Sequence, residues 1–272
     1  MHCSLLDMGG DGEPLLFAHA NGYPPGAYRQ LLARLDGHFH VSAMEQRPLW
    51  GDRQPPAGFN WHMLADDLLA IMAETFTGPI RVMGHSMGAV VAAIAARREP
   101  QRFSGLVLLD PVLLPSRWVL STRVMPSRQR RRIPMIRRAL TRPERFADHD
   151  EAFAFYRGKR AFRGFSDEAL HDYIGASKAR EANGELRLRY SGEWEAAVYA
   201  SPPLARRTLR GLRVPTVGFR GRDSDTLLPE MFARWARWQP EATLAEIPGG
   251  HLFPMENPTA TADAILRELF PA

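Results

Sequence analysis

The sequence predicts an α/β fold, in which helices flank a mostly parallel, twisted sheet and a helical cap is inserted before the last strands. Short apolar runs recur along the chain and alternate with amphipathic or alanine-rich stretches, a pattern typical of such a sheet. Several runs are almost continuously apolar, as are strands that are buried on both faces. The alternation stops between residues 111 and 212. We therefore expect a core of residues 1–110 and 213–272 and an inserted cap of residues 111–212.

Six apolar runs are the expected strands, and five periodic stretches between them are the expected helices. The strands are expected at residues 15–20, 39–44, 80–84, 105–110, 216–221 and 243–248. The helices are expected at residues 27–35, 61–76, 89–97, 229–238 and 258–270. Asn257 and Pro258 suit the N-cap and first-turn positions of the last helix.

The expected cap has a helical, aromatic and charged sequence in which no convincing strand run occurs. Its helices are expected at residues 151–158, 166–179 and 192–200, where apolar or aromatic residues recur at roughly helical spacing. A cap of this size beside the top of a sheet encloses a pocket. Most of its aromatic residues should form the core of the cap itself, namely Phe153, Phe155, Tyr156, Phe162, Phe165 and Tyr173.

The composition is that of one globular unit, with 272 residues of which 45% are hydrophobic and 24% are charged. Cys3 is the single cysteine and excludes an internal disulfide. The N-terminus lacks the basic start and apolar stretch of a signal peptide, so we expect a cytoplasmic protein. No apolar stretch is long enough to span a bilayer. The sequence leaves the oligomeric state open.

Positive charge is carried almost entirely by arginine, and its excess lies in the first part of the expected cap. The formal net charge is +5, and the only lysines are Lys159 and Lys178. Residues 117–145 are rich in arginine and contain one acidic residue, Glu144. Such a cluster can attract anionic substrates or lipid headgroups.

The same arginine cluster could also contact the phosphates of a nucleic acid, in particular through Arg130, Arg131 and Arg132. We instead favour a solvated helical surface and expect no nucleic-acid partner. No motif for reading bases is present, and aromatic residues do not interleave with the arginines as they do on a stacking platform.

The most informative motif is the pentapeptide Gly-His-Ser-Met-Gly at residues 84–88. It follows one expected strand and precedes an expected helix, which is the strand–turn–helix order of a nucleophile elbow. Such a turn strains the backbone of the serine, and the small glycines on either side permit it. Ser86 is therefore the expected catalytic nucleophile.

A serine hydroxyl is a poor nucleophile at neutral pH and needs a general base that an acid orients. In chains with a nucleophile elbow, the order is serine, acid, histidine. His251 is the one histidine in the last hundred residues, and it follows the last expected strand, so it is the expected base. We favour Asp225 as the acid because it lies in the loop just ahead of a helix, with Asp223 and Asp110 as alternatives.

Attack on a carbonyl produces an oxyanion that backbone amides must stabilise. The amide of Met87, at the start of the elbow helix, is one expected donor. The second donor should come from the loop of residues 19–25, where small residues and a glycine let the backbone approach a ligand. His19, His85 and Trp194 are the candidate substrate contacts.

Together these motifs resemble those of the α/β-hydrolase fold superfamily, and they span nearly the whole chain outside the cap. They are the oxyanion loop at residues 19–22, the elbow at 84–88, the acid loop at 220–229 and the histidine loop at 250–251 and 256–258. The resemblance implies that the amide of Asn21 is the second oxyanion donor, although Ala20 stands where members usually carry glycine. Residues 192–196 of the cap are similar to an esterase-like bacterial branch with a His-x-Asn-Gly loop.

Serine at the elbow argues against dehalogenation and epoxide opening, because relatives that carry out those reactions have aspartate there. We expect a serine hydrolase that cleaves a small carboxylic ester through an acyl-enzyme on Ser86, with a small-molecule acyl substrate and with neither a metal nor a cofactor. The alternatives are hydrolysis of thioesters, lactones or carbon–carbon bonds, and a non-catalytic ligand-binding member of the same fold.

Overall fold

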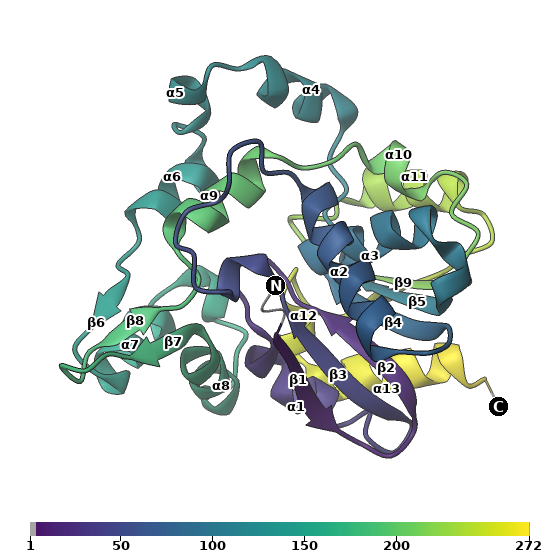
Figure 1. Ribbon diagram of the computed structural model, residues 1–272, viewed down its shortest axis with the longest axis horizontal. Coiled ribbons are helices and arrows are strands. Elements are labelled where there is room, and N and C mark those ends of the chain that lie inside the picture. Colours follow the sequence, from purple (N-terminus) through teal and green to yellow (C-terminus); the bar gives the residue numbers. More distant parts are fainter. Residues whose placement is uncertain (1–3, 272) are drawn as a thin grey trace.

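The computed structural model describes residues 4–271 and is built on a seven-stranded sheet (Figure 1). The strand order is β1-β3-β2-β4-β5-β9-β10; β1 runs antiparallel to β3, and all other neighbours are parallel. The strands are β1 (Ser4–Gly9), β2 (Glu13–Ala18), β3 (Phe39–Glu45), β4 (Ile80–His85), β5 (Phe103–Leu109), β9 (Thr216–Gly221) and β10 (Thr243–Ile247). The predicted fold class is confirmed. The edge strand β1 was not predicted, because its residues are only half-buried and lack a sustained apolar run.

Successive residues of the central strands pack into two different cores, one on each face of the sheet. In β2, for example, Leu15 and Phe17 join one core, while Leu16 and Ala18 join the other. Helices α1 (Arg29–Leu32), α12 (Phe253–Glu256) and α13 (Pro258–Leu269) cover the first core. Helices α2 (Trp61–Thr75), α3 (Met87–Arg98) and α11 (Pro229–Trp238) cover the second.

One expected core helix and one expected helix cap differ in the structure. The helix expected at 27–35 is a 3-10 turn, η1 (Pro25–Tyr28), followed by the single turn of α1. Asn257 holds the N-cap position of α13 with Pro258 after it, but its side chain makes no capping hydrogen bond. Two further 3-10 turns, η2 (Arg47–Leu49) and η3 (Pro100–Arg102), connect core elements.

The segment between β5 and β9 contains the expected helices and also three short strands. Its elements are α4 (Ser116–Val124), α5 (Ser127–Arg130), α6 (Pro134–Thr141), β6 (Arg145–Phe146), α7 (His149–Arg157), η4 (Arg160–Phe162), α8 (Asp167–Ser177), β7 (Lys178–Arg180), β8 (Leu186–Leu188), α9 (Gly192–Ala200) and α10 (Ala205–Leu209). The strands form a small antiparallel sheet in the order β6-β8-β7. Strands of two or three residues leave no recognisable alternation in the sequence, which is why they were missed. The helix expected at 166–179 accordingly ends at Ser177.

This segment lies beside the core sheet and is joined to it at both ends (Figure 1). Its aromatic residues Tyr156, Phe162, Phe165 and Tyr173 are buried as predicted, but in the first core cluster, which they share with the sheet. Phe153 and Phe155 are only partly buried against that cluster. Residues Ala205, Leu209 and Leu212 pack into the second core instead. We therefore propose that the cap ends near α9, and that the rest of the inserted segment, up to residue 212, packs as part of the core.

The loop that joins β3 to α2, residues 46–60, runs along α9 and attaches the inserted segment to the core (Figure 1). Ser191 donates a hydrogen bond to the carbonyl of Arg53 at 2.7 Å. Trp61, just after the loop, donates from its indole to the carbonyl of Val198 at 3.0 Å. Within residues 4–271 the helices are too short or too polar to cross a membrane. Cys3 lies outside the described residues.

Candidate active site

Ser86 lies at the sharp turn between β4 and α3, with the backbone conformation of a nucleophile elbow. Its φ of 56° and ψ of −114° are strained for a residue with a side chain. The flanking glycines make this turn possible: a Cβ on Gly84 would lie 2.5 Å from the backbone of Gly88, and a Cβ on Gly88 would lie 2.0 Å from the carbonyl oxygen of Ala18. The sequence therefore holds the serine hydroxyl at the carboxyl edge of the sheet.

His251 is within hydrogen-bonding distance of the nucleophile, with 2.9 Å between its Nε2 atom and Ser86 Oγ. Its other ring nitrogen, Nδ1, is 2.6 Å from Oδ2 of Asp110. A carboxylate only accepts hydrogen bonds, so Nδ1 carries the proton and Nε2 is free to accept the hydroxyl proton of Ser86. This is the arrangement that a general base requires.

The carboxylate that orients His251 is Asp110, which corrects the preference for Asp225. Asp110 is fully buried and accepts hydrogen bonds from three groups: the His251 ring, the Ser224 hydroxyl at 2.5 Å and the Gly221 amide at 2.8 Å. Asp225 is exposed, and within the described residues its side chain accepts only from the neighbouring Thr226 hydroxyl, at 3.4 Å.

The strand order explains this choice of acid. β5 lies between β4 and β9 in the sheet, so the residue that follows β5 is next to Ser86. Asp110 turns out of the strand with φ of 41°, and its amide donates to the carbonyl of Phe219. The loop after β9 contributes Ser224 rather than a carboxylate. Its side chain also accepts hydrogen bonds from the amides of Thr226 and Leu227, so it is fixed in place. Sequence reasoning missed Ser224, because it considered only the carboxylates of that loop.

The loop that carries His251 is held by contacts with β9 and α12. A Cβ on Gly221 would lie 2.3 Å from the carbonyl oxygen of Gly250, so only glycine permits this close approach. The amide of Gly250 donates to the carboxylate of Glu256 at 3.0 Å. These contacts hold the imidazole over the nucleophile.

The expected oxyanion donors lie in two segments that touch. Met87 is the first residue of α3, where an amide has no partner within the helix. The same close approach that requires glycine at position 88 brings the backbone of Ala18 and His19 against the start of α3. The side chain of Asn21 is engaged elsewhere, since Tyr190 donates to its Oδ1 at 2.7 Å. The role of the Asn21 and Met87 amides stays a prediction.

His19 is buried and holds the oxyanion loop instead of facing a substrate. Its Nδ1 donates to the carbonyl of Ala20 at 2.8 Å, and its Nε2 accepts from the amide of Gln46 at 3.2 Å. Burial lowers the pKa of His19 to about 4, so the ring is neutral at pH 7. Both nitrogens are occupied and the residue is 0% exposed, which argues against the expected substrate contact.

His85 is likewise a structural link. Its Nε2 donates to the carbonyl of His251 at 2.9 Å, so its Nδ1 accepts from the hydroxyl of Tyr28 at 2.7 Å. The Tyr28 oxygen in turn accepts from the amide of Ala20. Burial, followed by the nearby His251, holds the pKa of His85 well below its usual value. The chain of hydrogen bonds joins the oxyanion loop, the elbow and the histidine loop.

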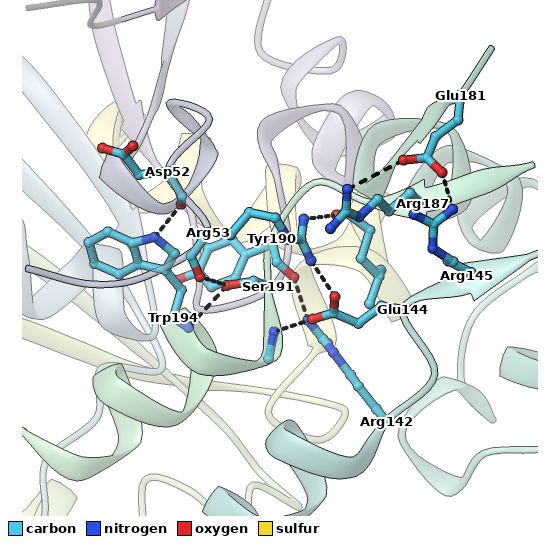
Figure 2. Close-up of polar contacts among 12 residues, drawn as sticks. Asp52, Arg53, Arg142, Glu144, Arg145, Glu181, Arg187, Tyr190, Ser191 and Trp194 are labelled. Carbon is cyan, nitrogen blue, oxygen red and sulfur yellow. Dashed lines mark hydrogen bonds and ion pairs between the residues drawn. The ribbon is translucent and has the colours of Figure 1, made fainter.

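Trp194 is the third predicted substrate contact, and the structure places it in a different role. Figure 2 shows its indole nitrogen directed at the carbonyl of Asp52, at 2.6 Å. Its ring packs edge-on against Phe59 and is almost fully buried. Trp194 therefore fastens α9 to the loop of residues 46–60.

The arginine-rich segment is largely solvent-exposed, as the favoured interpretation expects. Arg131 pairs with Glu193, Arg130 donates to the carbonyl of Met125, and Arg132 is exposed. The nucleic-acid alternative stays untested. Within residues 4–271 no group of three or more His, Cys, Asp or Glu side chains is placed to hold a metal ion.

A cavity of about 630 Å³ lies beside this segment, and its lining contains no acidic side chain. Its lining includes five arginines, Arg97, Arg98, Arg123, Arg130 and Arg207, together with His62. Arg97 is near the end of α3, whereas Ser86 directly precedes that helix, so the two are separated by about 16 Å of helix. The cavity is therefore distinct from the site at Ser86.

The strained serine, the imidazole and the buried carboxylate meet at the carboxyl edge of a parallel sheet, which defines the nucleophile-elbow class of α/β proteins. The model of the alpha/beta hydrolase family matches residues 15–264. The chain belongs to the alpha/beta hydrolase family.

Three similar proteins illustrate the relationship. Human monoglyceride lipase is 29% identical over 126 residues, which are 42% of this chain and 40% of the lipase. The matched region thus spans about 40% of that relative's length. Among solved structures, an E-2-(acetamidomethylene)succinate hydrolase has a TM-score of 0.79 at 19% identity, covering 98% of both chains. A thermophilic esterase from Thermogutta terrifontis has a TM-score of 0.68 at 25% identity, covering 98% of this chain and 92% of the esterase.

Proposed function

We propose that this chain is a serine hydrolase that cleaves a small carboxylic ester. The observation that carries the proposal is the pair of distances through His251, 2.9 Å to the Ser86 hydroxyl and 2.6 Å to the Asp110 carboxylate. Two similar proteins are named a lipase and an esterase, and both names refer to ester hydrolysis. The inserted segment is the proposed cap over the acyl substrate.

The reaction follows from the roles of these side chains. Ser86 Oγ attacks the substrate carbonyl while His251 Nε2 takes its proton, and Asp110 stabilises the resulting imidazolium. The amides of Met87 and Asn21 are the proposed donors to the oxyanion. His251 then gives the proton to the leaving alcohol. Water, activated by the same imidazole, releases the acid from Ser86.

A fluorophosphonate probe and a short 4-nitrophenyl ester test this function together. The protein should be labelled on Ser86 and should turn the ester over, and Ser86→Ala should abolish labelling and lower kcat by roughly a thousandfold or more. Folding of the variant is checked by circular dichroism. If the native protein neither reacts with the probe nor hydrolyses any ester, thioester or lactone, it is a ligand-binding member of the family instead.

A further inference from the structure

Lys178, at the start of β7, is buried in the inserted segment without a carboxylate partner among residues 4–271. Its ammonium group lies 4.2, 5.1 and 5.4 Å from the ring centres of Tyr156, Tyr173 and Phe146. In the described part of the chain, its ammonium group donates one hydrogen bond, to the hydroxyl of Ser177 at 3.0 Å. Aromatic faces stabilise a cation only in part, and lysine is rarely buried unless it is paired.

A second cation, Arg142, lies close enough to Lys178 to lower its pKa. Its own charge is paired with one carboxylate, that of Glu195. Its guanidinium pairs with Glu195 at 2.5 Å. It also donates to the carbonyl of Tyr190 at 2.8 Å (Figure 2). Its Nε atom is buried without a hydrogen-bond partner in the described structure. Burial, together with the charge of Arg142, lowers the pKa of Lys178 to about 7. Among residues 4–271, Glu195 therefore pairs with Arg142, and Lys178 has no carboxylate of its own.

This cation pair borders the loop that carries the proposed oxyanion donor. A Cβ on Gly22 would lie 3.7 Å from Glu195 Oε2 and 3.9 Å from Arg142 Nη1. The ring of Tyr23, the next residue, is 5.3 Å from the ring of Tyr173, which in turn contacts Lys178. The side chains of Arg142 and Glu195 remain 17% and 13% exposed, so solvent reaches this side of the cluster.

We propose that Arg142 and Lys178 form a subsite for a carboxylate carried by the substrate, so that the enzyme prefers acyl groups that end in an acid. The proposal rests on the hydrolase function above and narrows its substrate class. A substrate carboxylate would supply the second anion that the two cations lack and would accept charge-assisted hydrogen bonds. Because Arg142 lies beside Gly22 of the oxyanion loop, we expect a short acyl chain to join the substrate's acid to its reacting carbonyl.

A purely structural role would explain the Arg142–Glu195 pair but not the buried Lys178. The Arg142–Glu195 pair fastens the inserted segment to the oxyanion loop, since the backbone of Glu195 also accepts from the Asn21 side chain. A buried lysine adds nothing to that attachment, because an apolar side chain would pack between the same three rings without the desolvation of a charge. The lysine therefore points to a ligand of opposite charge.

Matched substrates test the proposal. The mono(4-nitrophenyl) esters of succinic, glutaric and adipic acid are each compared with the neutral 4-nitrophenyl ester of the same length, and the rate of Ser86→Ala is subtracted because these hemiesters also hydrolyse unaided. For at least one length, native kcat/KM should favour the acid by at least about tenfold, the range of one charge-assisted hydrogen bond.

The ratio of the two kcat/KM values, acidic over neutral, identifies the residue responsible. Lys178→Met should lower that ratio by roughly tenfold or more, whereas Lys159→Met, which changes the exposed lysine of the same segment, should leave it unchanged. Equal preference for both esters in the native protein, or an equal loss on both substrates in Lys178→Met, would overturn the proposal.

Binding without turnover gives an independent measurement. Glutarate should bind to the Ser86→Ala protein in calorimetry, and competing neutral ester should raise its apparent Kd. Adding Lys178→Met should weaken the binding by about tenfold or more, and no glutarate binding at any accessible concentration would count against the subsite. Hydrolysis of neutral esters without acid preference refutes only the subsite, whereas absence of all hydrolysis and labelling refutes the proposed function itself.

Discussion

Two buried polar clusters lie on either side of the oxyanion loop, and they differ in how completely the protein pairs their charges. At the elbow, Asp110 accepts three hydrogen bonds and His251 has a partner on each ring nitrogen. In the inserted segment as the structure describes it, Glu195 pairs with Arg142, whereas Lys178 is buried without a carboxylate partner. All polar groups of the first cluster have partners in the free protein, whereas the second cluster has one more positive charge than negative charges. We infer that the catalytic groups are fully positioned in the free protein, whereas the charge of Lys178 is paired only when a ligand binds.

The largest effect should come from removing the carboxylate that completes the first cluster. Asp110→Asn keeps the size of the side chain but no longer stabilises the charged imidazole, so kcat should fall by roughly a thousandfold or more. Asp225→Asn is the matched control and should stay within about twofold, because Asp225 is exposed and His251 is bonded to Asp110 instead. Steady-state hydrolysis of a 4-nitrophenyl ester measures both. A larger loss in Asp225→Asn would restore the acid that the sequence favoured.

The contrast between these two aspartates shows what sequence reasoning could reach. Ser86 and His251 were predicted because local turn chemistry marks each of them within a few residues. The choice of Asp110 depends on β5 lying next to β4, which is a long-range pairing that no local pattern encodes. The structural hydrogen bonds of His19 and His85 were not foreseen for a similar reason. Their hydrogen-bond partners include Gln46 and Tyr28, which are distant in sequence.

The inserted segment was the least predictable region, although its helices were found. Strands β6, β7 and β8 have two or three residues each, too few for an alternation to be recognised. The pairing of Arg142 with Glu195 joins two helical regions more than fifty residues apart. Charge alone identified the arginine-rich stretch, but the structure places most of it on an exposed surface and only Arg142 beside the oxyanion loop.

The surplus charge of the second cluster should lower the stability of the free protein. The pKa of Lys178 falls from 10.5 in the unfolded chain to about 7 in the folded protein, so the unfolded state binds more protons between these values and stability rises with pH across that window. By linkage the charge costs about 4 kcal/mol at pH 7 and about 2 kcal/mol at pH 9.

Lys178→Met should therefore unfold with a free energy at least about 2 kcal/mol higher than the native protein at pH 7, part of the gain being offset by the lost aromatic contacts. The advantage should shrink as pH approaches 10. Urea unfolding followed by circular dichroism measures both values. If the variant is less stable at pH 7 than the native protein, Lys178 is a structural residue and the contrast between the two clusters disappears.

His19 adds a second pH dependence with the same main cause as that of Lys178, because burial lowers the pKa of both groups. Its pKa is about 4 in the folded protein against 6.5 in the unfolded chain, so stability is fully present above pH 6.5 and is lost as pH falls toward 4. The expected loss from His19 between pH 7 and pH 5 is about 2 kcal/mol. His19→Gln, which cannot be protonated, should flatten this part of the unfolding profile. An unchanged slope in the variant would mean that His19 is already charged or exposed.

The smallest effect should come from Ser224, whose hydroxyl donates one of the three hydrogen bonds that Asp110 accepts. Ser224→Ala removes one of three hydrogen bonds to Asp110 and leaves the carboxylate, the imidazole and the nucleophile in place. Because a hydrogen bond to a charged group contributes about 1.5 kcal/mol or more, kcat should fall by about tenfold. Ser201→Ala, which removes a hydroxyl bonded only within the inserted segment, is the control.

The loss should appear in kcat rather than in KM, since Ser224 acts on the base and not on the substrate. A change confined to KM would indicate that the loop after β9 faces the ligand, and the elbow would then be less self-contained than its hydrogen bonds imply.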